Sequence, residues 1–136
     1  MAPEGEKILR DAGLDVVSTD PYPAKDAVKA LLVKTQASAI VVRLIERVDE
    51  DIMKATPSLK VIAKHGAGTN DIDVAAAKSL GIPVLAAVGA NAHSVAEHAL
   101  AMILALAKDL RNQDAYVRAG GWDKKNYVGF ELRGRR

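Results

Sequence analysis

Short apolar runs alternate with helical patterns along most of this sequence, and that alternation limits the possible folds more than any other feature. The predicted strands cover residues 14–18, 39–42, 61–63 and 83–88. The predicted helices before and between them cover residues 3–12, 24–34, 49–55 and 73–80. Strands that alternate with helices in this way indicate right-handed βαβ units and a parallel sheet.

Four strands are one fewer than in a common five-stranded doubly wound domain, and the sequence opens on a helix. In a sheet of order 2-1-3-4-5 the first strand lies inside the sheet, so its loss leaves unpaired backbone groups on two neighbours. We therefore predict an α/β fold: a flavodoxin-like doubly wound parallel sheet whose first strand is missing. We also expect that the natural N-terminus was cut or misassigned.

A long interdomain helix is predicted from Asn91 to about residue 117. Its residues 99–107 are apolar on nearly every side, as in a helix that is buried all round. A domain this small covers only one face of such a helix, so we expect another domain or another subunit to cover the other. The predicted domains are residues 1–90, the α/β domain truncated at its N-terminus, and residues 91–136, the long helix and a polar, basic tail.

Composition excludes several classes of function. The formal net charge of +2 gives no electrostatic reason to expect nucleic acid as a partner. The absence of cysteine excludes disulfides, thiolate metal sites and cysteine nucleophiles, and it fits a cytoplasmic protein. The longest apolar run, residues 99–107, is far shorter than the ~20 residues of a membrane span.

The stretch from residue 59 to 73 carries the strongest local signal for a binding site. An apolar strand there runs into a Gly-Ala-Gly turn, and open α/β sheets bind ligands at the carboxyl ends of their strands. Gly66 and Gly68 can adopt positive φ, and consecutive amides in such a turn form an anion-binding nest. We therefore predict a carboxylate site built from the main chain of Gly66, Ala67 and Gly68, with Lys64 adding a positive charge. The alternative is that the glycines only shape a tight turn.

Other chemical signals are weak. His93 and His98 lie five residues apart on one helix and do not share a face, so no metal site is predicted. His65 lies beside the glycine turn, where it could reach a ligand. Gly66-Ala67-Gly68 is followed by Asp71 and not by a third glycine, so the chain carries no dinucleotide fingerprint. The predicted strands do not end in clustered acids, which disfavours a receiver-like domain.

Two motifs and four shorter matches point to a known family. The motifs are His-Gly-Ala-Gly-Thr-Asn-Asp-Ile-Asp at residues 65–73 and Gly-Ala-Asn-Ala-His-Ser-Val-Ala-Glu-His at residues 89–98. The shorter matches lie at residues 75–77, 81–84, 120–122 and 131–134. Together they cover most of the chain and resemble the substrate-binding domain of the D-isomer-specific 2-hydroxyacid dehydrogenases. The nearest groups are the D-3-phosphoglycerate dehydrogenases and the hydroxypyruvate or glyoxylate reductases.

This resemblance implies a role for each matching position. The main chain of residues 66–68 is expected to hold the substrate carboxylate, and Lys64 to meet an anionic substrate tail. Asn91 is expected at the hinge, facing both substrate and nicotinamide. Ala67 and Val95 are expected to contribute to cofactor binding, with Val95 near the nicotinamide ring. The long helix, residues 91–117, is expected to contribute to a homodimer.

The same resemblance implies an oxidoreductase that uses NAD (or NADP) and acts on the CH–OH group of (R)-2-hydroxy acids. In the family, the nucleotide-binding domain and the catalytic arginine and His–Glu pair follow the region matched by residues 133–134. Hydride transfer needs a bound nicotinamide and an acid–base group, so this chain alone is predicted to be inactive and to bind no cofactor tightly. Two alternatives remain: a non-enzymatic dimerisation or small-acid-binding module, and a split enzyme completed by a separate chain.

Overall fold

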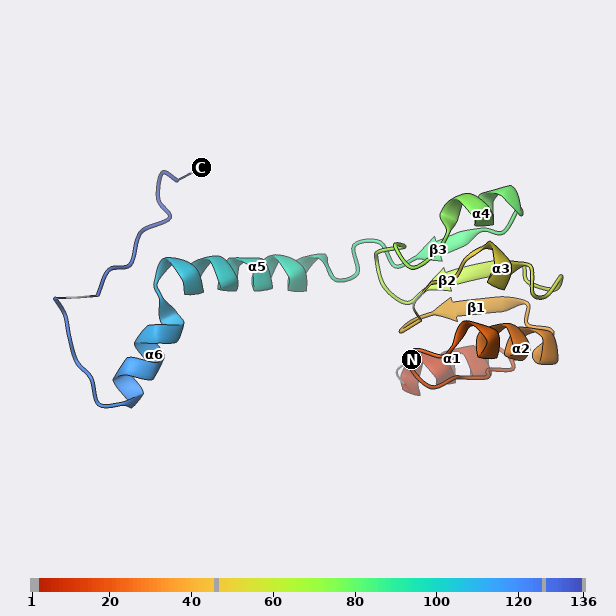
Figure 1. Ribbon diagram of the computed structural model, residues 1–136, viewed down its shortest axis with the longest axis horizontal. Coiled ribbons are helices and arrows are strands. Elements are labelled where there is room, and N and C mark those ends of the chain that lie inside the picture. Colours follow the sequence, from red (N-terminus) through yellow and green to blue (C-terminus); the bar gives the residue numbers. More distant parts are fainter. Residues whose placement is uncertain (1–2, 46, 126, 136) are drawn as a thin grey trace. The chain divides into compact units, whose positions relative to one another are not determined.

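The computed structural model of the protein describes residues 3–45, 47–125 and 127–135. The chain divides into two compact units, Met1–Ala90 and Asn91–Arg136. The first unit holds a parallel sheet with helices, and the second holds two helices and a tail (Figure 1). Among the described residues, none of the helices combines the length and apolar character needed to cross a membrane.

The sheet of the first unit has three parallel strands. They are β1 (Ala39–Val42), β2 (Val61–Lys64) and β3 (Val84–Ala86), in the spatial order β1-β2-β3. Each strand is separated from the next in the sequence by a helix, so the prediction of an α/β fold with a parallel sheet is confirmed. β2 lies in the middle, which places the loop that follows it at the centre of the carboxyl edge.

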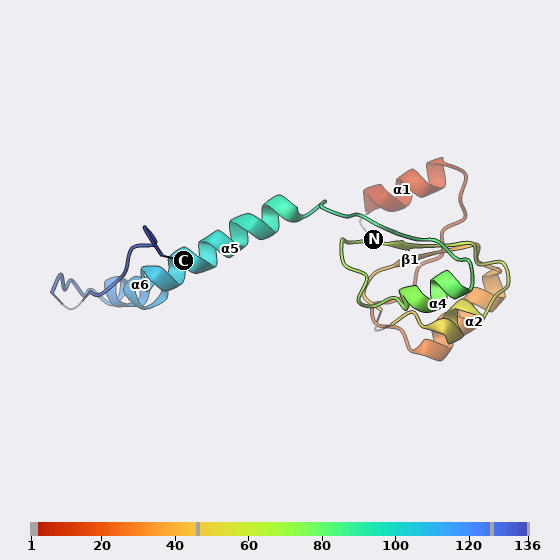
Figure 2. The ribbon, with the colours of Figure 1, turned by 90° about the horizontal axis from the view of Figure 1, so that it is seen from above.

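Among the described residues, four helices belong to this unit: α1 (Pro3–Asp11), α2 (Lys25–Thr35), α3 (Glu50–Met53) and α4 (Val74–Ser79). The helices α2 and α4 lie on one side of the sheet and α1 lies on the other (Figure 2). α3 packs against both α2 and α4. The starts of α3 and α4 are fixed by aspartate caps, because Asp49 accepts from the Ile52 amide at 3.1 Å and Asp73 from the Ala76 amide at 3.0 Å.

The two faces of the sheet differ in burial. On one face Val42 and Ile62 are almost completely buried, whereas on the other Val41 and Leu85 are 41% and 59% exposed. The buried face contributes to a single apolar core, in which a fully buried aliphatic side chain contributes about 1.5–3 kcal/mol. The core residues are Val28, Leu32, Val42, Val48, Ile52, Met53, Leu59, Ile62, Ile72, Ala77 and Ile82.

The strand predicted at residues 14–18 is wrong, because this segment forms neither strand nor helix. In a sheet of order 2-1-3-4-5 the second strand pairs only with the first. Among the described residues, none of the strands of the sheet pairs with this segment. Its first residue instead caps α1, since the Leu14 amide donates to the Leu9 carbonyl at 3.1 Å. Leu14 and Val17 remain more than half exposed.

The second unit begins with α5 (Ala92–Ala107), followed by α6 (Leu110–Arg118). The prediction of one continuous helix to residue 117 is therefore wrong. Asp109 breaks it by adopting a left-handed conformation with φ of 47°. Aspartate tolerates this conformation because its short polar side chain can hydrogen-bond locally, and here its carboxylate accepts from Asn112 Nδ2 at 2.7 Å.

The tail of the second unit returns to the end of α5. The Phe130 amide donates to the Ala107 carbonyl at 2.9 Å, and the Tyr127 hydroxyl donates to the Lys108 carbonyl at 2.8 Å. These bonds satisfy carbonyl groups that the end of a helix leaves unpaired. They also bury Ala107, while most apolar residues of α5 stay exposed.

Candidate functional site at the carboxyl end of the central strand

Residues 65–70, here called the Gly66 loop, connect β2 to the turn that precedes α4. Gly66 has a φ of 144°, which only glycine adopts readily. Its amide donates to the Lys64 carbonyl at 3.0 Å, and its carbonyl accepts from the Ala87 amide at 3.0 Å. Both backbone polar groups of Gly66 therefore have partners inside the protein, and the predicted contact of its main chain with a ligand stays a prediction.

The next two residues present free donors. Among the described residues, the amides of Ala67 and Gly68 have no hydrogen-bond acceptor. Ala67 is half-buried and Gly68 is exposed, so this part of the loop is open to solvent. Gly68 also leaves its surroundings open, since a Cβ built there would meet nothing within 4 Å. Adjacent unpaired amides at the end of a central strand can bind an anion.

Lys64 and Asp71 form an ion pair across the Gly66 loop. Their side chains are only 15% and 21% exposed, so both charges are largely removed from water. The second carboxylate oxygen of Asp71, Oδ1, is buried and has no hydrogen-bond partner among the described residues. The positive charge predicted beside the loop is therefore present, but it is already paired.

Backbone bonds hold the far end of the Gly66 loop. The Val48 amide donates to the Asp71 carbonyl at 2.7 Å, and the Asp73 amide donates to the Val48 carbonyl at 2.9 Å. Val48 and Ile72 thus form a parallel bridge outside the named strands, and both are buried. This bridge joins the connection after β1 to the connection after β2.

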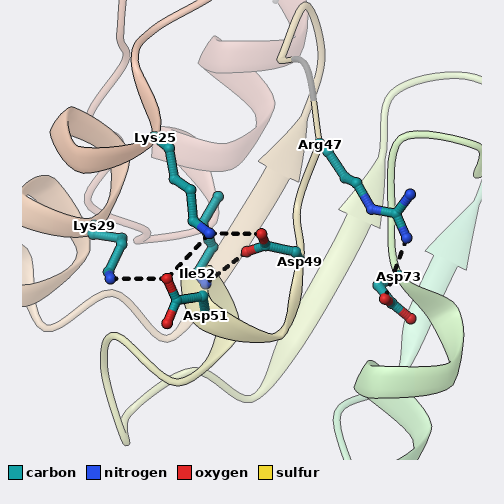
Figure 3. Close-up of polar contacts among 7 residues, drawn as sticks. All are labelled: Lys25, Lys29, Arg47, Asp49, Asp51, Ile52 and Asp73. Carbon is teal, nitrogen blue, oxygen red and sulfur yellow. Dashed lines mark hydrogen bonds and ion pairs between the residues drawn. The ribbon is translucent and has the colours of Figure 1, made fainter.

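Charged residues surround the starts of α3 and α4 (Figure 3). Lys25 Nζ lies 2.6 Å from Asp49 and 3.1 Å from Asp51, and Lys29 Nζ lies 3.2 Å from Asp51. The hydrogen bond from Lys25 is the main reason that the pKa of Asp49 and of Asp51 lies below its ordinary value. The hydrogen bond from the Ala76 amide is the main cause that lowers the pKa of Asp73.

A pocket of about 250 Å³ opens among these charged residues, but it does not suit an acid. Its lining residues are Asp49, Glu50, Asp51, Lys54 and Asp73. Four of these five side chains are carboxylates, which repel an anionic ligand. The Gly66 loop, with its free amides, is therefore the better site for a carboxylate.

The remaining predicted site residues belong to other places in the chain. Asn91 directly precedes α5 and Val95 lies in its first turn, so both belong to the second unit. His65 is the first residue of the Gly66 loop and is exposed, and His93 and His98 are exposed on α5. The described residues contain no group of three or more metal-ligating side chains that could hold an ion.

Sequence reasoning missed the role of Asp71. The signal was its position, since Lys64 and Asp71 flank the glycine turn with opposite charges. In the sequence Asp71 stands out only as the residue that breaks a dinucleotide fingerprint. The chain has no Gly-x-Gly-x-x-Gly run.

The family model of the D-isomer specific 2-hydroxyacid dehydrogenase catalytic domain matches residues 1–129. The chain therefore belongs to the D-isomer-specific 2-hydroxyacid dehydrogenase family. The match covers both structural units.

Individual relatives agree with the family. The D-3-phosphoglycerate dehydrogenase of Archaeoglobus fulgidus is 36% identical over 127 residues, which are 93% of this chain and 24% of that protein. The chain thus spans about a quarter of the length of this curated relative. The crystal structure of the TT0316 protein from Thermus thermophilus matches with a TM-score of 0.80 and 27% identity, over 96% of this chain and 43% of that one.

A third relative was solved with ligands. The D-lactate dehydrogenase of Aquifex aeolicus, in complex with NAD and lactic acid, matches with a TM-score of 0.75 and 25% identity. The match covers 97% of this chain and 40% of that one. NAD and a 2-hydroxy acid therefore occur together in a protein that shares this fold.

Proposed function

We propose that this chain is the substrate-binding portion of an NAD- or NADP-dependent oxidoreductase. The reaction is the reversible interconversion of (R)-2-hydroxy acids and 2-keto acids, of the 3-phosphoglycerate, hydroxypyruvate or glyoxylate type. Membership of the family supports the reaction class. The three groups of substrates are those that the resemblance of the motifs implies.

The observation that carries the proposal is the pair of free amides on Ala67 and Gly68. They follow the central strand, where open α/β sheets bind ligands. In the proposed complex these amides donate to the substrate carboxylate and orient the 2-carbon. Hydrogen bonds to a charged acceptor are about twice as strong as neutral ones, so two amides are enough to fix a small acid.

The remaining chemistry needs groups that the described residues do not supply. A bound nicotinamide would supply or accept the hydride, and Asn91 and Val95 are the residues proposed to face it. No acid–base group of this chain is assigned to proton transfer. We therefore propose that the chain alone binds the acid without turning it over.

Nuclear magnetic resonance on the ¹⁵N-labelled full chain tests the binding step. Glycolate is a 2-hydroxy acid, and glycolamide is its matched control because a neutral amide replaces the carboxylate. We expect saturable shifts of the Ala67 and Gly68 amide signals with glycolate and none with glycolamide. Shifts elsewhere only, or equal shifts with both compounds, would reject the site. Sustained oxidation of NADH with glyoxylate by the pure chain would reject the proposed inactivity.

A second candidate function rests on the apolar surface of α5. Leu100, Ile103 and Leu106 are 58%, 46% and 78% exposed. Exposed apolar surface of this kind marks an interaction site. We propose that residues 91–117 pair with a second copy of the chain, so that the chain is a homodimer. A stable dimer that binds no small acid would favour a non-enzymatic dimerisation module over the substrate-binding portion of an enzyme.

A further inference from the structure

We propose that Lys64 and Asp71 form a clasp that positions the Gly66 loop, and that Lys64 is not a ligand of the substrate. This inference rests on the proposed function, because the Gly66 loop is the proposed carboxylate site. It changes the role that the family resemblance implies for Lys64. It also adds Asp71 as a positioning residue.

The geometry of the pair is that of a closed loop. Lys64 is the last residue of β2, and Asp71 is the first residue after the Gly66 loop. Their ion pair therefore connects the two ends of this six-residue loop. The Lys64 side chain passes Gly66 on the way, since a Cβ built on Gly66 would lie 3.5 Å from Lys64 Cε. The Lys64 carbonyl also accepts the Gly66 amide, so both its backbone and its side chain hold the loop.

Asp71 is fixed on its other side by the backbone. Its carbonyl accepts the Val48 amide at 2.7 Å, and Val48 is completely buried. A continuous series of contacts therefore runs from β2 through Lys64 and Asp71 to the core. Fixing the ends of a loop lowers the entropy that its amides lose when a ligand binds, which is the basis of preorganisation.

The state of the Asp71 carboxylate explains why Lys64 is not free to bind a substrate. Oδ1 of Asp71 is buried without a partner among the described residues, and Oδ2 has Lys64. If Lys64 moved to a substrate anion, Asp71 would become a largely buried carboxylate with no side-chain partner among those residues. Removing one partner of such a pair is strongly unfavourable, so the substrate would have to compete against the clasp.

The two roles of Lys64 predict opposite effects of one substitution. If Lys64 is a ligand of the anionic substrate tail, Asp71→Asn releases its charge and 3-phosphoglycerate, which has such a tail, binds more tightly. If Lys64 belongs to a clasp, Asp71→Asn loosens the loop and glycolate binds more weakly. The experiment measures the dissociation constants of glycolate and of 3-phosphoglycerate from the amide shifts of the full chain and of four variants. The variants are Asp71→Asn, Lys64→Met, the double variant of these two, and Lys64→Arg.

For a clasp we expect Asp71→Asn and Lys64→Met each to weaken glycolate binding about fivefold, the order of magnitude of a partly exposed ion pair. The double variant should bind no worse than either single variant, because it leaves no unpaired charge. Lys64→Arg keeps the pair and should stay within about twofold of the natural chain. Tighter binding by Asp71→Asn would overturn the clasp. A double variant whose loss of binding equals the combined losses of the two single variants would also overturn it.

A second measurement separates this inference from the proposed function. In the absence of ligand, ¹⁵N relaxation reports the order of the Ala67 and Gly68 amides. A clasp predicts lower order in both single variants and natural order in Lys64→Arg. If the natural chain binds no glycolate, the proposed function fails. The relaxation data then show by themselves whether Lys64 and Asp71 hold the loop in place. If the single variants keep natural loop order, the clasp is rejected whatever the binding data show.

Discussion

The amide of Ala87 donates to the carbonyl oxygen of Gly66 across 3.0 Å, which ties the residue after β3 to the loop after β2. The backbone of Gly66 has a φ of 144°, a value that residues with a Cβ atom rarely adopt. This conformation directs the Gly66 carbonyl towards the Ala87 amide. The shape of the proposed carboxylate site therefore depends on backbone conformation at one position. That dependence leads to the first prediction.

Gly66→Ala should destabilise the first unit by about 1–3 kcal/mol, the usual cost of a residue held in a sparsely populated conformation. The cost comes from the backbone, because the new Cβ would meet only Lys64 Cε at an ordinary 3.5 Å. Gly68→Ala is the matched control, since Gly68 has neither positive φ nor a close neighbour, and it should stay close to the natural chain. Urea unfolding measures both, and equal stabilities would contradict the prediction.

Stability should fall in acid, and Asp73 should contribute to that fall. In the folded chain the Ala76 amide, then Arg47, hold the pKa of Asp73 below its ordinary value. The unfolded chain regains the ordinary value, about 4, so it takes up protons first as the pH drops. The stabilisation is therefore complete above that pH and is lost as the pH falls through the lower pKa of the folded state.

Urea midpoints at about pH 6, 4.5 and 3, which bracket the ordinary aspartate pKa, measure this effect in the natural chain and in Asp73→Asn. The variant should show a shallower loss of stability across the acidic half of that range. Asp49 and Asp51 keep their own lowered pKa values, so part of the acid dependence should remain. If the urea midpoint of the variant falls with pH as steeply as that of the natural chain, Asp73 does not contribute to the acid dependence.

Ile62 is the best probe of the core beneath the site. It lies in the central strand and is completely buried. Ile62→Val removes one methylene there and should lower the free energy of unfolding by about 1 kcal/mol. Ile8→Val is the same chemical change at a position that is 68% exposed in α1, so it should cost much less. Comparable losses for the two variants would mean that the core is not centred on β2.

The proposed homodimer depends on the apolar surface of α5. Ile103→Glu places a charge in the middle of that helix and should convert a dimer into a monomer in light scattering. Lys78→Glu in α4 is the control, since it changes charge on the first unit at an exposed position and should leave the mass unchanged. A natural chain that is already monomeric at micromolar concentration would reject the dimer.

The alternating strands and helices of the first unit were predicted well from the sequence, because the periodicity of apolar residues and the helix caps are local signals. Residues 39–42 form a strand with the predicted limits, and α4 starts immediately after its cap, Asp73. The segment 14–18 failed for a non-local reason. Its apolar pattern suits a strand, but a strand also needs a partner, and no single segment carries that information.

The break at Asp109 and the clasp were missed for related reasons. Asp109 lies in a helical pattern that continues on both sides, and only its left-handed conformation reveals two helices. The glycine turn indicated the loop and its free amides. It did not indicate that Gly66 uses its own amide internally or that Lys64 is paired, since both depend on the path of the loop in three dimensions.

The bridge between Val48 and Ile72 has a consequence for how homologous chains can vary in length. Each bridged residue directly precedes the aspartate that starts the next helix, Asp49 for α3 and Asp73 for α4. Deleting one residue before either bridged residue would break the bridge or move the capped helix that follows it, and so shift one helix against the other. Insertions and deletions should therefore be rare between each strand and its cap, and a change in one connection should be matched by a change in the other.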